Sequence, residues 1–132
     1  MTDSLLYSET AEHLANLDHC GSNELRRAYL AIVLATLRSG YVANPRPKGV
    51  SRELQVRDGE GAQPFAVVVN RESLLFHLRQ PALRSDPGLA TEARSRFAER
   101  LLDESSSANE IRIPINSERD ADDIADWLFP TP

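Results

Sequence analysis

The sequence predicts an α+β fold in which helices pack on a small antiparallel sheet. Three observations lead to this class: apolar residues recur at helical spacing near both ends of the chain, strand-like alternation replaces that spacing in the middle, and turn residues separate the segments. With 132 residues and 41% hydrophobic side chains, the chain has the size and composition of one compact domain. We therefore expect a single domain over residues 1–132 with the element order ααβββαβα.

The N-terminal part is predicted to form a helical hairpin. Ser8 can cap a first helix over residues 9–18, Gly21 ends it, and a second helix follows over residues 24–39. Apolar side chains surround most of the second helix within residues 28–37. Because a helix that is apolar on most sides is normally buried, we expect neighbouring elements to cover it almost completely.

Residues 41–50 are predicted to be a connecting loop. Pro45, Pro47 and Gly49 lie within a few residues of one another and flank two basic side chains. Proline lacks a backbone donor and fixes its own φ, which excludes regular helix and a central strand here.

Three strands are expected to follow this loop as an antiparallel meander. Residues 53–57 and 74–79 alternate between apolar and polar side chains, whereas residues 65–69 are continuously apolar and rich in valine. Residues 58–61 and 70–73 have the composition of turns. A strand that is apolar on both sides is typical of the middle of a sheet, so residues 65–69 are predicted to be the central strand.

The C-terminal part is predicted to contain a helix, a fourth strand and a last helix. Asp86 is the expected N-cap of an amphipathic helix, and residues 103–109 form a Ser-rich loop. Residues 111–115 alternate as a strand does, and Pro114 places that strand at an edge of the sheet. Ser117 then begins the final helix with a pattern that resembles a capping box.

Charge is distributed unevenly along the chain, although the net charge is −5. Residues 26–57 hold seven basic side chains and one acidic side chain, a net charge of +6, whereas residues 103–126 hold eight acidic and two basic side chains, a net charge of −6. The basic residues are fourteen arginines and the single Lys48. Arginine stays protonated, so Lys48 is the one side chain that is suited to Schiff-base chemistry.

Two groups of residues are candidates for binding an anion or a nucleic acid. One group lies in the basic stretch, because arginine and lysine make most phosphate contacts. The other is a His-Arg pair two residues apart on one side of a predicted strand, which suits a phosphate or carboxylate. The sequence pI of about 5.2 opposes a dedicated nucleic-acid domain, since such domains are usually basic. The candidate residues are Arg46, Lys48, Arg52, Arg57, His77 and Arg79.

Standard catalytic and metal-binding motifs are absent from the sequence. It contains no Gly-x-x-x-x-Gly-Lys, Gly-x-Gly-x-x-Gly, His-Glu-x-x-His or Gly-x-Ser-x-Gly pattern. His13 and Cys20 share one helix face but are about 10 Å apart along it, and His19 points away from Cys20. We therefore expect no metal and no cofactor. An enzyme with a nonstandard site at His77 or Cys20 is a third alternative for the function.

The sequence predicts a cytoplasmic protein without a membrane span. The longest apolar run, residues 28–37, is well short of the roughly twenty residues that cross a bilayer. The N-terminus has neither the basic segment nor the apolar core of a secretory signal. A single cysteine, Cys20, excludes an intramolecular disulfide and fits a reducing compartment.

By elimination, the leading hypothesis is a non-catalytic protein-interaction module, such as a regulator, an inhibitor or an immunity-type protein. The edge strand offers unpaired backbone groups to another protein, and the last helix offers a row of carboxylates to a basic partner. The acidic segment of one copy can also face the basic segment of another, which predicts a homodimer that weakens as ionic strength rises. The runner-up is a nucleic-acid or anion-binding accessory domain that uses residues 26–57. The candidate interface residues are Ile111, Ile113, Asp122, Asp123, Asp126 and Trp127.

Overall fold

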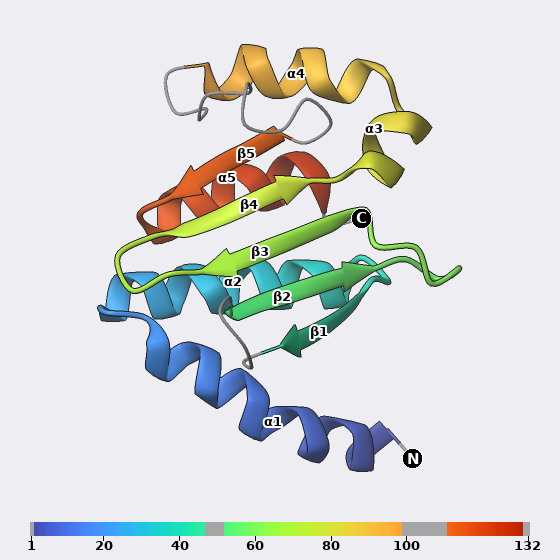
Figure 1. The fold of residues 1–132 in the computed structure, drawn as a ribbon. Helices are drawn as coiled ribbons and strands as arrows, with labels where there is room; N and C mark the ends of the chain where they lie inside the picture. The colour runs from blue at the N-terminus through green and yellow to red at the C-terminus, as the bar shows by residue number, and fades with distance from the viewer. Residues whose placement is uncertain (1, 47–51, 99–110, 131–132) are drawn as a thin grey trace.

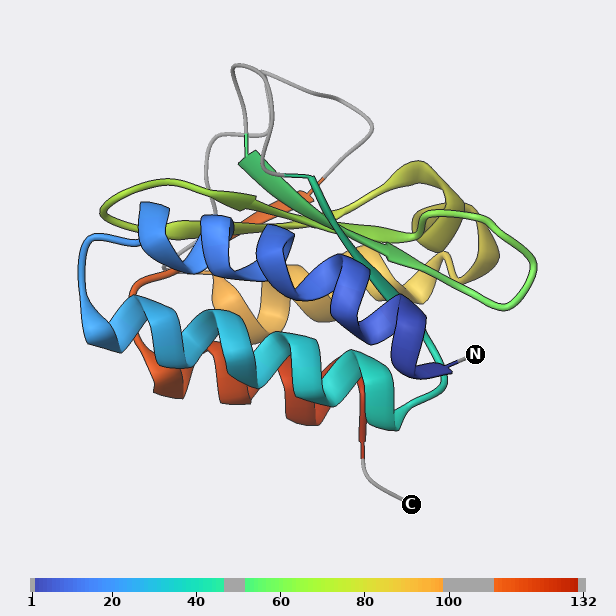
Figure 2. The ribbon, with the colours of Figure 1, turned by 90° about the horizontal axis from the view of Figure 1, so that it is seen from below.

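A computed structural model describes residues 2–46, 52–98 and 111–130 of the chain. Five antiparallel strands form one sheet, and the long helices α1, α2, α4 and α5 lie on the same side of it (Figures 1 and 2). The elements follow the order ααββββααβα. The predicted α+β class is confirmed, but the structure contains one strand and one helix more than were predicted.

The predicted N-terminal hairpin is present as α1 (Thr2–His19) and α2 (Asn23–Arg38). Helix α1 begins well before the predicted start, so Ser8 lies within the helix and the prediction that it caps the helix is wrong. Ser22 is the N-cap of α2, since its hydroxyl oxygen accepts a hydrogen bond of 3.2 Å from the backbone N–H of Leu25. The start of the second helix of the hairpin is therefore fixed by its N-cap.

The sheet order β1-β2-β3-β4-β5 follows the order of the strands along the chain. Its middle three strands are the predicted meander, with Val67 of β3 between Leu54 of β2 and Phe76 of β4. Among the described residues the last strand, β5, pairs with β4 alone, as predicted for an edge strand. The strands are β1 (Val42–Arg46), β2 (Arg52–Arg57), β3 (Phe65–Val69), β4 (Leu74–Leu78) and β5 (Ile111–Ile115).

Strand β1 lies in the segment for which the sequence analysis predicted a connecting loop, residues 41–50. Ala43 pairs with Val56 and Pro45 pairs with Leu54 in the antiparallel register. A proline is tolerated here because β1 is an edge strand, whose outer side needs no backbone donor. The loop prediction is therefore wrong for β1, and the rest of the predicted loop lies outside the described residues.

The link between α1 and α2 passes very close to the turn between β3 and β4. The backbone N–H of Gly21 donates a hydrogen bond of 2.7 Å to the carbonyl oxygen of Arg71. A Cβ atom on Gly21 would lie 2.5 Å from that same oxygen. Glycine is therefore required at this position by the close approach of two backbones, which fixes the hairpin to the sheet.

Two helices, α3 (Gln80–Ser85) and α4 (Gly88–Phe97), occupy the region for which one helix was predicted. Asp86 lies between them and accepts a hydrogen bond of 3.1 Å from the backbone N–H of Gly88 through Oδ1. The start of α4 thus agrees with the predicted cap within about two residues, whereas α3 was missed. The predicted Ser-rich loop over residues 103–109 lies outside the described residues.

The last helix, α5 (Glu118–Leu128), begins much as the capping pattern predicted. Ser117 Oγ accepts a hydrogen bond of 3.1 Å from the backbone N–H of Asp120. In return, Asp120 Oδ2 accepts one of 2.9 Å from the backbone N–H of Asn116. The aspartate therefore reaches one residue further back than the glutamate of a standard capping box.

The core lies between the sheet and the helix layer. An aromatic cluster of Tyr41, Phe65, Phe76 and Phe129 closes one end of it, with ring centroids 5.3 to 6.4 Å apart. These side chains come from segments far apart in the sequence, and Phe129 follows directly after α5. The cluster therefore holds the C-terminal helix against the sheet.

Helix α2 is not covered on most sides, contrary to the prediction. Tyr29 and Ile32 are fully buried toward the sheet, but Leu30, Leu34 and Leu37 are 42%, 56% and 49% exposed. The reason is the layered architecture: α2 has the sheet on one side and α5 beside it, and its third side faces outward (Figure 2).

Candidate functional site

The predicted pair His77 and Arg79 lies on the outer face of the sheet, the face opposite the long helices. Phe76 and Leu78 are buried in the core, so alternation along β4 directs His77 and Arg79 to the other face. Arg112 of β5 is the direct neighbour of His77 in the register. All three polar side chains are half-buried. The structure thus brings these two predicted residues to one face.

Arg57 belongs to a hydrogen-bonded row along β2 on the same outer face. Gln55 Nε2 donates to Glu53 Oε1 at 2.9 Å, and Arg57 Nη2 donates to Gln55 Oε1 at 2.8 Å. Arg57 Nη1 also donates to the carbonyl oxygen of Gly61 at 3.3 Å. The row includes the carboxylate of Glu53, so the face presents mixed polarity instead of a cationic surface.

The residues of the basic stretch do not converge on one surface. Arg26 donates two hydrogen bonds of 3.1 Å to carbonyl oxygens at the end of α1, which is a structural role. Arg46 and Arg57 lie on the outer sheet face, whereas the alternation of β2 places Arg52 on the helix side. Lys48 lies outside the described residues. Of the predicted anion-binding residues that the structure describes, Arg46, Arg57, His77 and Arg79 therefore share the outer face, and Arg52 is separated from them.

A buried polar network joins α1, α2 and β2. Asn16 Nδ2 donates to Tyr29 Oη at 3.1 Å and to the carbonyl oxygen of Glu53 at 3.2 Å, and His13 Nδ1 lies 2.8 Å from Tyr29 Oη. A neutral His13 with Nδ1 unprotonated can accept the proton of the Tyr29 hydroxyl, while Tyr29 Oη accepts from Asn16. Burial lowers the pKa of His13, against the opposing charges of nearby glutamates, and so favours this neutral form.

Cys20 is a buried thiol at the end of α1. Its Sγ donates a weak hydrogen bond of 3.5 Å to the carbonyl oxygen of Asn16. Burial raises the pKa of Cys20, and the charge of Arg26 offsets this only in part. A raised pKa keeps the thiol protonated, which is the opposite of the activation that a cysteine nucleophile needs.

A shallow groove of about 400 Å³ runs between α2 and α5 on the outer side of the helix layer. Leu30, Leu34 and Leu37 follow one another along α2 at spacings of four and three residues, so one side of this helix is an exposed apolar stripe. Leu30 and Leu34 line the groove itself. We name this surface the α2–α5 groove and define it by Arg27, Leu30, Leu34, Arg38, Asp122 and Asp126.

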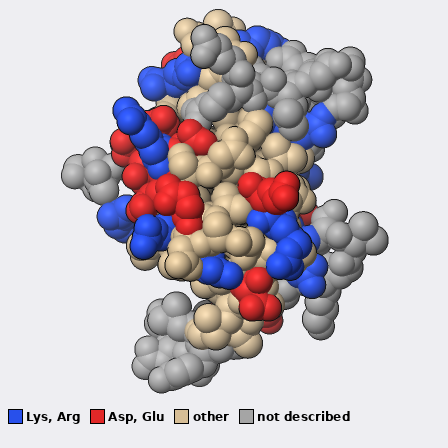
Figure 3. Space-filling model, turned by 90° about the vertical axis from the view of Figure 1, so that its left-hand side faces the viewer, with Lys and Arg blue, Asp and Glu red and all other residues tan. Residues whose placement is uncertain are grey.

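Charges of opposite sign border the α2–α5 groove on its two helices. Helix α2 contributes Arg27 and Arg38, and helix α5 contributes Asp122 and Asp126. Within the described part of the chain, the side chains of Arg38, Asp122 and Asp126 make no hydrogen bond or ion pair. On the side of the molecule where α2 and α5 begin, basic and acidic side chains are intermixed (Figure 3). The groove thus combines an apolar stripe with unlike charges.

The predicted protein-interface residues are separated by the fold. Asp122, Asp123 and Asp126 are exposed on α5, as the sequence predicted for an acidic helix face. Ile111 and Ile113 are 3% and 0% exposed, because the alternation of β5 turns their side chains toward the helices. The prediction for these two isoleucines needs correction: they are core residues, and β5 can offer a partner its backbone edge but not these side chains.

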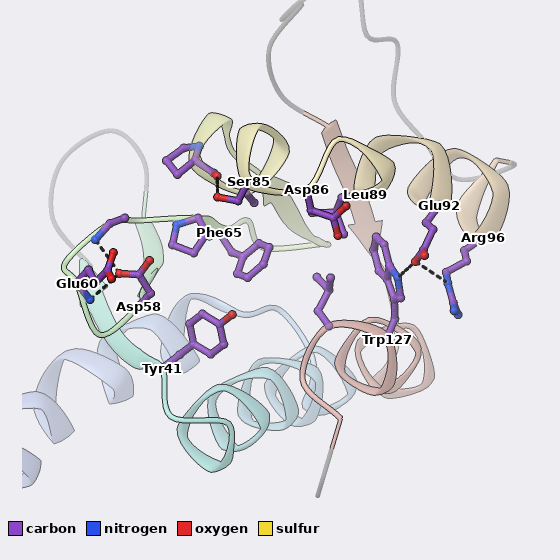
Figure 4. A pocket seen from close by; sticks show the side chains of 15 residues that line it. Tyr41, Asp58, Glu60, Phe65, Ser85, Asp86, Leu89, Glu92, Arg96 and Trp127 are labelled. Carbon is purple, nitrogen blue, oxygen red and sulfur yellow. Dashed lines mark hydrogen bonds and ion pairs between the residues drawn. The ribbon is translucent and has the colours of Figure 1, made fainter.

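A larger cleft of about 660 Å³ lies at one end of the sheet, among the β2–β3 turn, α3, α4 and the end of α5 (Figure 4). Tyr41, Phe65 and Trp127 give it an aromatic lining. Trp127, predicted as an interface residue, is half-buried and packs on Phe97 with ring centroids 5.5 Å apart. The cleft has the volume of typical ligand pockets, about 300–1,000 Å³.

Carboxylates stand at both ends of this cleft, with the aromatic side chains between them (Figure 4). Asp58 and Glu60 come from the β2–β3 turn, and Asp86 and Glu92 come from the start and the middle of the α4 region. Asp58 Oδ1 accepts backbone hydrogen bonds of 2.9 Å from Glu60 and 3.0 Å from Ala62, which fixes the turn. The lining therefore carries more negative than positive charge.

At the Trp127 end, the cleft already holds a cation that belongs to the chain. Glu92 Oε2 accepts a hydrogen bond of 2.6 Å from Trp127 Nε1 and lies 3.9 Å from Arg96 Nε. The guanidinium carbon of Arg96 is 5.6 Å from the centroid of the Trp127 ring. An aromatic ring and a carboxylate thus form a place for a planar cation.

No protein-family model, curated protein or solved structure matches this chain. None of the helices in the described ranges combines the length and apolar composition needed to cross a membrane. Within those same ranges, no group of three or more His, Cys, Asp or Glu side chains is placed to hold a metal ion. The shape and charge of the α2–α5 groove and of the cleft therefore have to indicate the function.

Sequence reasoning missed both the cleft and the exposed leucine stripe. Tyr41, Phe65 and Trp127 lie in three distant segments, and no local pattern links them. For the stripe a signal was present: Arg27 and Arg38 interrupt the apolar surface of the second helix on a single side. That interruption marks the side that faces outward.

Proposed function

We propose that this chain is a non-catalytic protein-interaction module of the cytoplasm that docks through the α2–α5 groove. The observation that carries the proposal is the exposed stripe of Leu30, Leu34 and Leu37 beside charges of both signs. Contiguous exposed apolar surface commonly marks a protein contact, and an apolar helix face is a frequent docking element. The single, reduced Cys20 supports the cytoplasmic assignment.

The occupant that fits the groove is a second copy of this chain. Helices α2 and α5 run in the same direction (Figure 1). A two-fold axis along the groove therefore lays α2 of each copy over α5 of the other. Arg27 and Arg38 of one copy then face Asp122 and Asp126 of the second copy, and this match occurs twice. The leucine stripes are covered in the same contact.

The alternative of nucleic-acid or anion binding has weaker support from the geometry. Arg46 and Arg57 lie on the outer sheet face, whereas Arg27 and Arg38 lie on the opposite side of the molecule. His77, Arg79 and Arg112 share the outer sheet face with Arg46 and Arg57, but the row along β2 also holds the carboxylate of Glu53, so the face is not a continuous cationic path for a polyanion.

Charge reversal in two complementary variants tests the proposed contact. The first variant carries Arg27→Glu and Arg38→Glu, so both walls of its groove are acidic. The second carries Asp122→Lys and Asp126→Lys, so both walls are basic. We expect wild type to dimerise at low ionic strength, each variant to be monomeric alone, and an equimolar mixture to form a heterodimer. Sedimentation velocity at low and high ionic strength measures this directly.

A matched control carries the same change in charge away from the groove. Arg71→Glu with Arg84→Glu alters the β3–β4 turn and α3, where both side chains are exposed, and we expect it to dimerise as wild type does. A wild-type protein that is monomeric at every ionic strength and at high concentration overturns the second-copy assignment. Dimers that survive both reversals but disappear in Arg112→Pro place the contact at the β5 edge and also contradict the proposal.

A further inference from the structure

We infer that the cleft beside Trp127 binds a linear organic cation with two amino or guanidino groups separated by an apolar spacer. This inference is independent of the α2–α5 groove. The aromatic floor of the cleft and the two separated pairs of carboxylates at its ends carry it together (Figure 4). A ligand of this class places its apolar middle on the rings and its charged ends beside the carboxylates.

The middle of the cleft suits the apolar spacer. Tyr41 and Phe65 lie between the two acidic ends, with ring centroids 6.0 Å apart. Tyr41 is half-buried, and Leu89 and Ala82 complete an apolar wall. Phe65, Leu89 and Ala82 are already buried, so a methylene chain on this floor covers mainly the exposed part of the Tyr41 ring.

The two acidic ends suit two positive charges. At the first end, the carboxylate of Glu60 is exposed beside Asp58, whose Oδ1 is engaged in the turn. At the second end, Asp86 is exposed and bonds the backbone N–H of Gly88 through one carboxylate oxygen. A singly charged ligand can satisfy one end only, so the class of ligand with two cationic groups is favoured.

The side chain of Arg96 already places a positive charge at one end of this cleft. Its guanidinium lies against the Trp127 ring and the Glu92 carboxylate. An incoming cationic group therefore competes with Arg96 at that end of the cleft. Removal of this competing charge is expected to strengthen binding, whereas removal of a rim carboxylate is expected to weaken it.

Titration of the full chain with cadaverine tests the inference, with n-pentylamine and pentanediol as analogues that carry one charge and none. Isothermal titration calorimetry gives the affinity, and the fluorescence of Trp127, the single tryptophan of the chain, reports binding at the cleft. We expect cadaverine to bind roughly fivefold more tightly than n-pentylamine and pentanediol to bind more weakly still. Added salt is expected to weaken the binding of cadaverine.

Three variants locate the site. Glu60→Gln is expected to weaken cadaverine binding by roughly three- to fivefold, and Arg96→Gln is expected to strengthen it. The control Glu72→Gln removes an exposed carboxylate on the β3–β4 turn and is expected to leave the affinity unchanged. Absence of heat and of a fluorescence change at millimolar cadaverine overturns the inference. Equal affinity for cadaverine and n-pentylamine, or equal loss in Glu60→Gln and Glu72→Gln, overturns it as well.

Discussion

The inner and outer sides of helix α2 both carry large apolar side chains but differ in what covers them. On the inner side Tyr29 and Ile32 are completely buried, whereas on the outer side Leu30 and Leu34 are about half exposed. The sheet, α1 and α5 pack around the rest of the helix, and nothing in the described part of the chain lies over the outer side (Figure 2). The helical spacing of apolar residues therefore predicts the helix, but the position of neighbouring elements decides which of its apolar side chains form the core.

The largest expected effect comes from truncation on the inner side. Ile32→Ala removes a fully buried side chain between α2 and the sheet. We expect the free energy of unfolding to fall by about 2–5 kcal/mol, because the lost burial and the cavity left behind add together. Chemical denaturation monitored by circular dichroism measures the change. A midpoint equal to that of wild type contradicts the burial of this side of α2.

The polar part of the inner side is tested by Tyr29→Phe. The change removes the hydroxyl that accepts from Asn16 and lies 2.8 Å from His13 Nδ1. The buried Asn16 and the half-buried His13 then each lose a partner, and we expect a loss of about 1–3 kcal/mol in the free energy of unfolding. Tyr41→Phe is the matched control, since no hydrogen bond of the Tyr41 hydroxyl occurs among the described residues. Equal stability of both variants contradicts the proposed network.

A smaller effect is expected from the protonation of His13. Burial lowers the pKa of His13 below its ordinary value of 6.5, so the unfolded chain takes up this proton at a higher pH than the folded chain. The contribution to stability is complete above about pH 6.5 and is lost as the pH falls through the folded-state pKa. His13→Gln is expected to flatten the decline of stability with falling pH in this window, as thermal unfolding across the pH range shows. An unchanged slope contradicts the role of His13.

Most of the fold follows from local pattern. The capping pair Ser117 and Asp120, the alternation of β2 and β4, and Pro114 at the edge all identify their elements from sequence. The errors have a different origin. Val42–Arg46 is a strand despite Pro45 because its partner β2 supplies the pairing, which is a tertiary effect that no window of sequence contains.

The site was less predictable than the fold. Alternation correctly placed His77 and Arg79 on one face, because the period of a strand is fixed. The cleft was missed because Tyr41 before β1, Phe65 in β3 and Trp127 in α5 are far apart in the sequence and converge only in the assembled fold. The isoleucines Ile111 and Ile113 were misassigned because an apolar edge strand looks the same in sequence whether its side chains face a partner or the core of the protein.

The smallest change in stability is expected for a truncation on the outer side of α2, and it tests the contrast between the two sides most directly. Leu34→Ala shortens a side chain that is 56% exposed, so little burial is lost and no closed cavity forms. Alanine also has the higher intrinsic helix propensity, which offsets part of the loss. We expect the free energy of unfolding of the monomer to change by no more than about 0.5 kcal/mol.

The same change is expected to weaken self-association, since Leu34 lies in the stripe that the second copy covers. Denaturation at low protein concentration therefore reports the fold alone, and sedimentation velocity at high concentration reports the contact. A loss of about 2 kcal/mol or more at low concentration means that the outer side of α2 is covered within one chain. In that case the leucine stripe is core and not a docking surface, and the contrast between the two sides of α2 disappears.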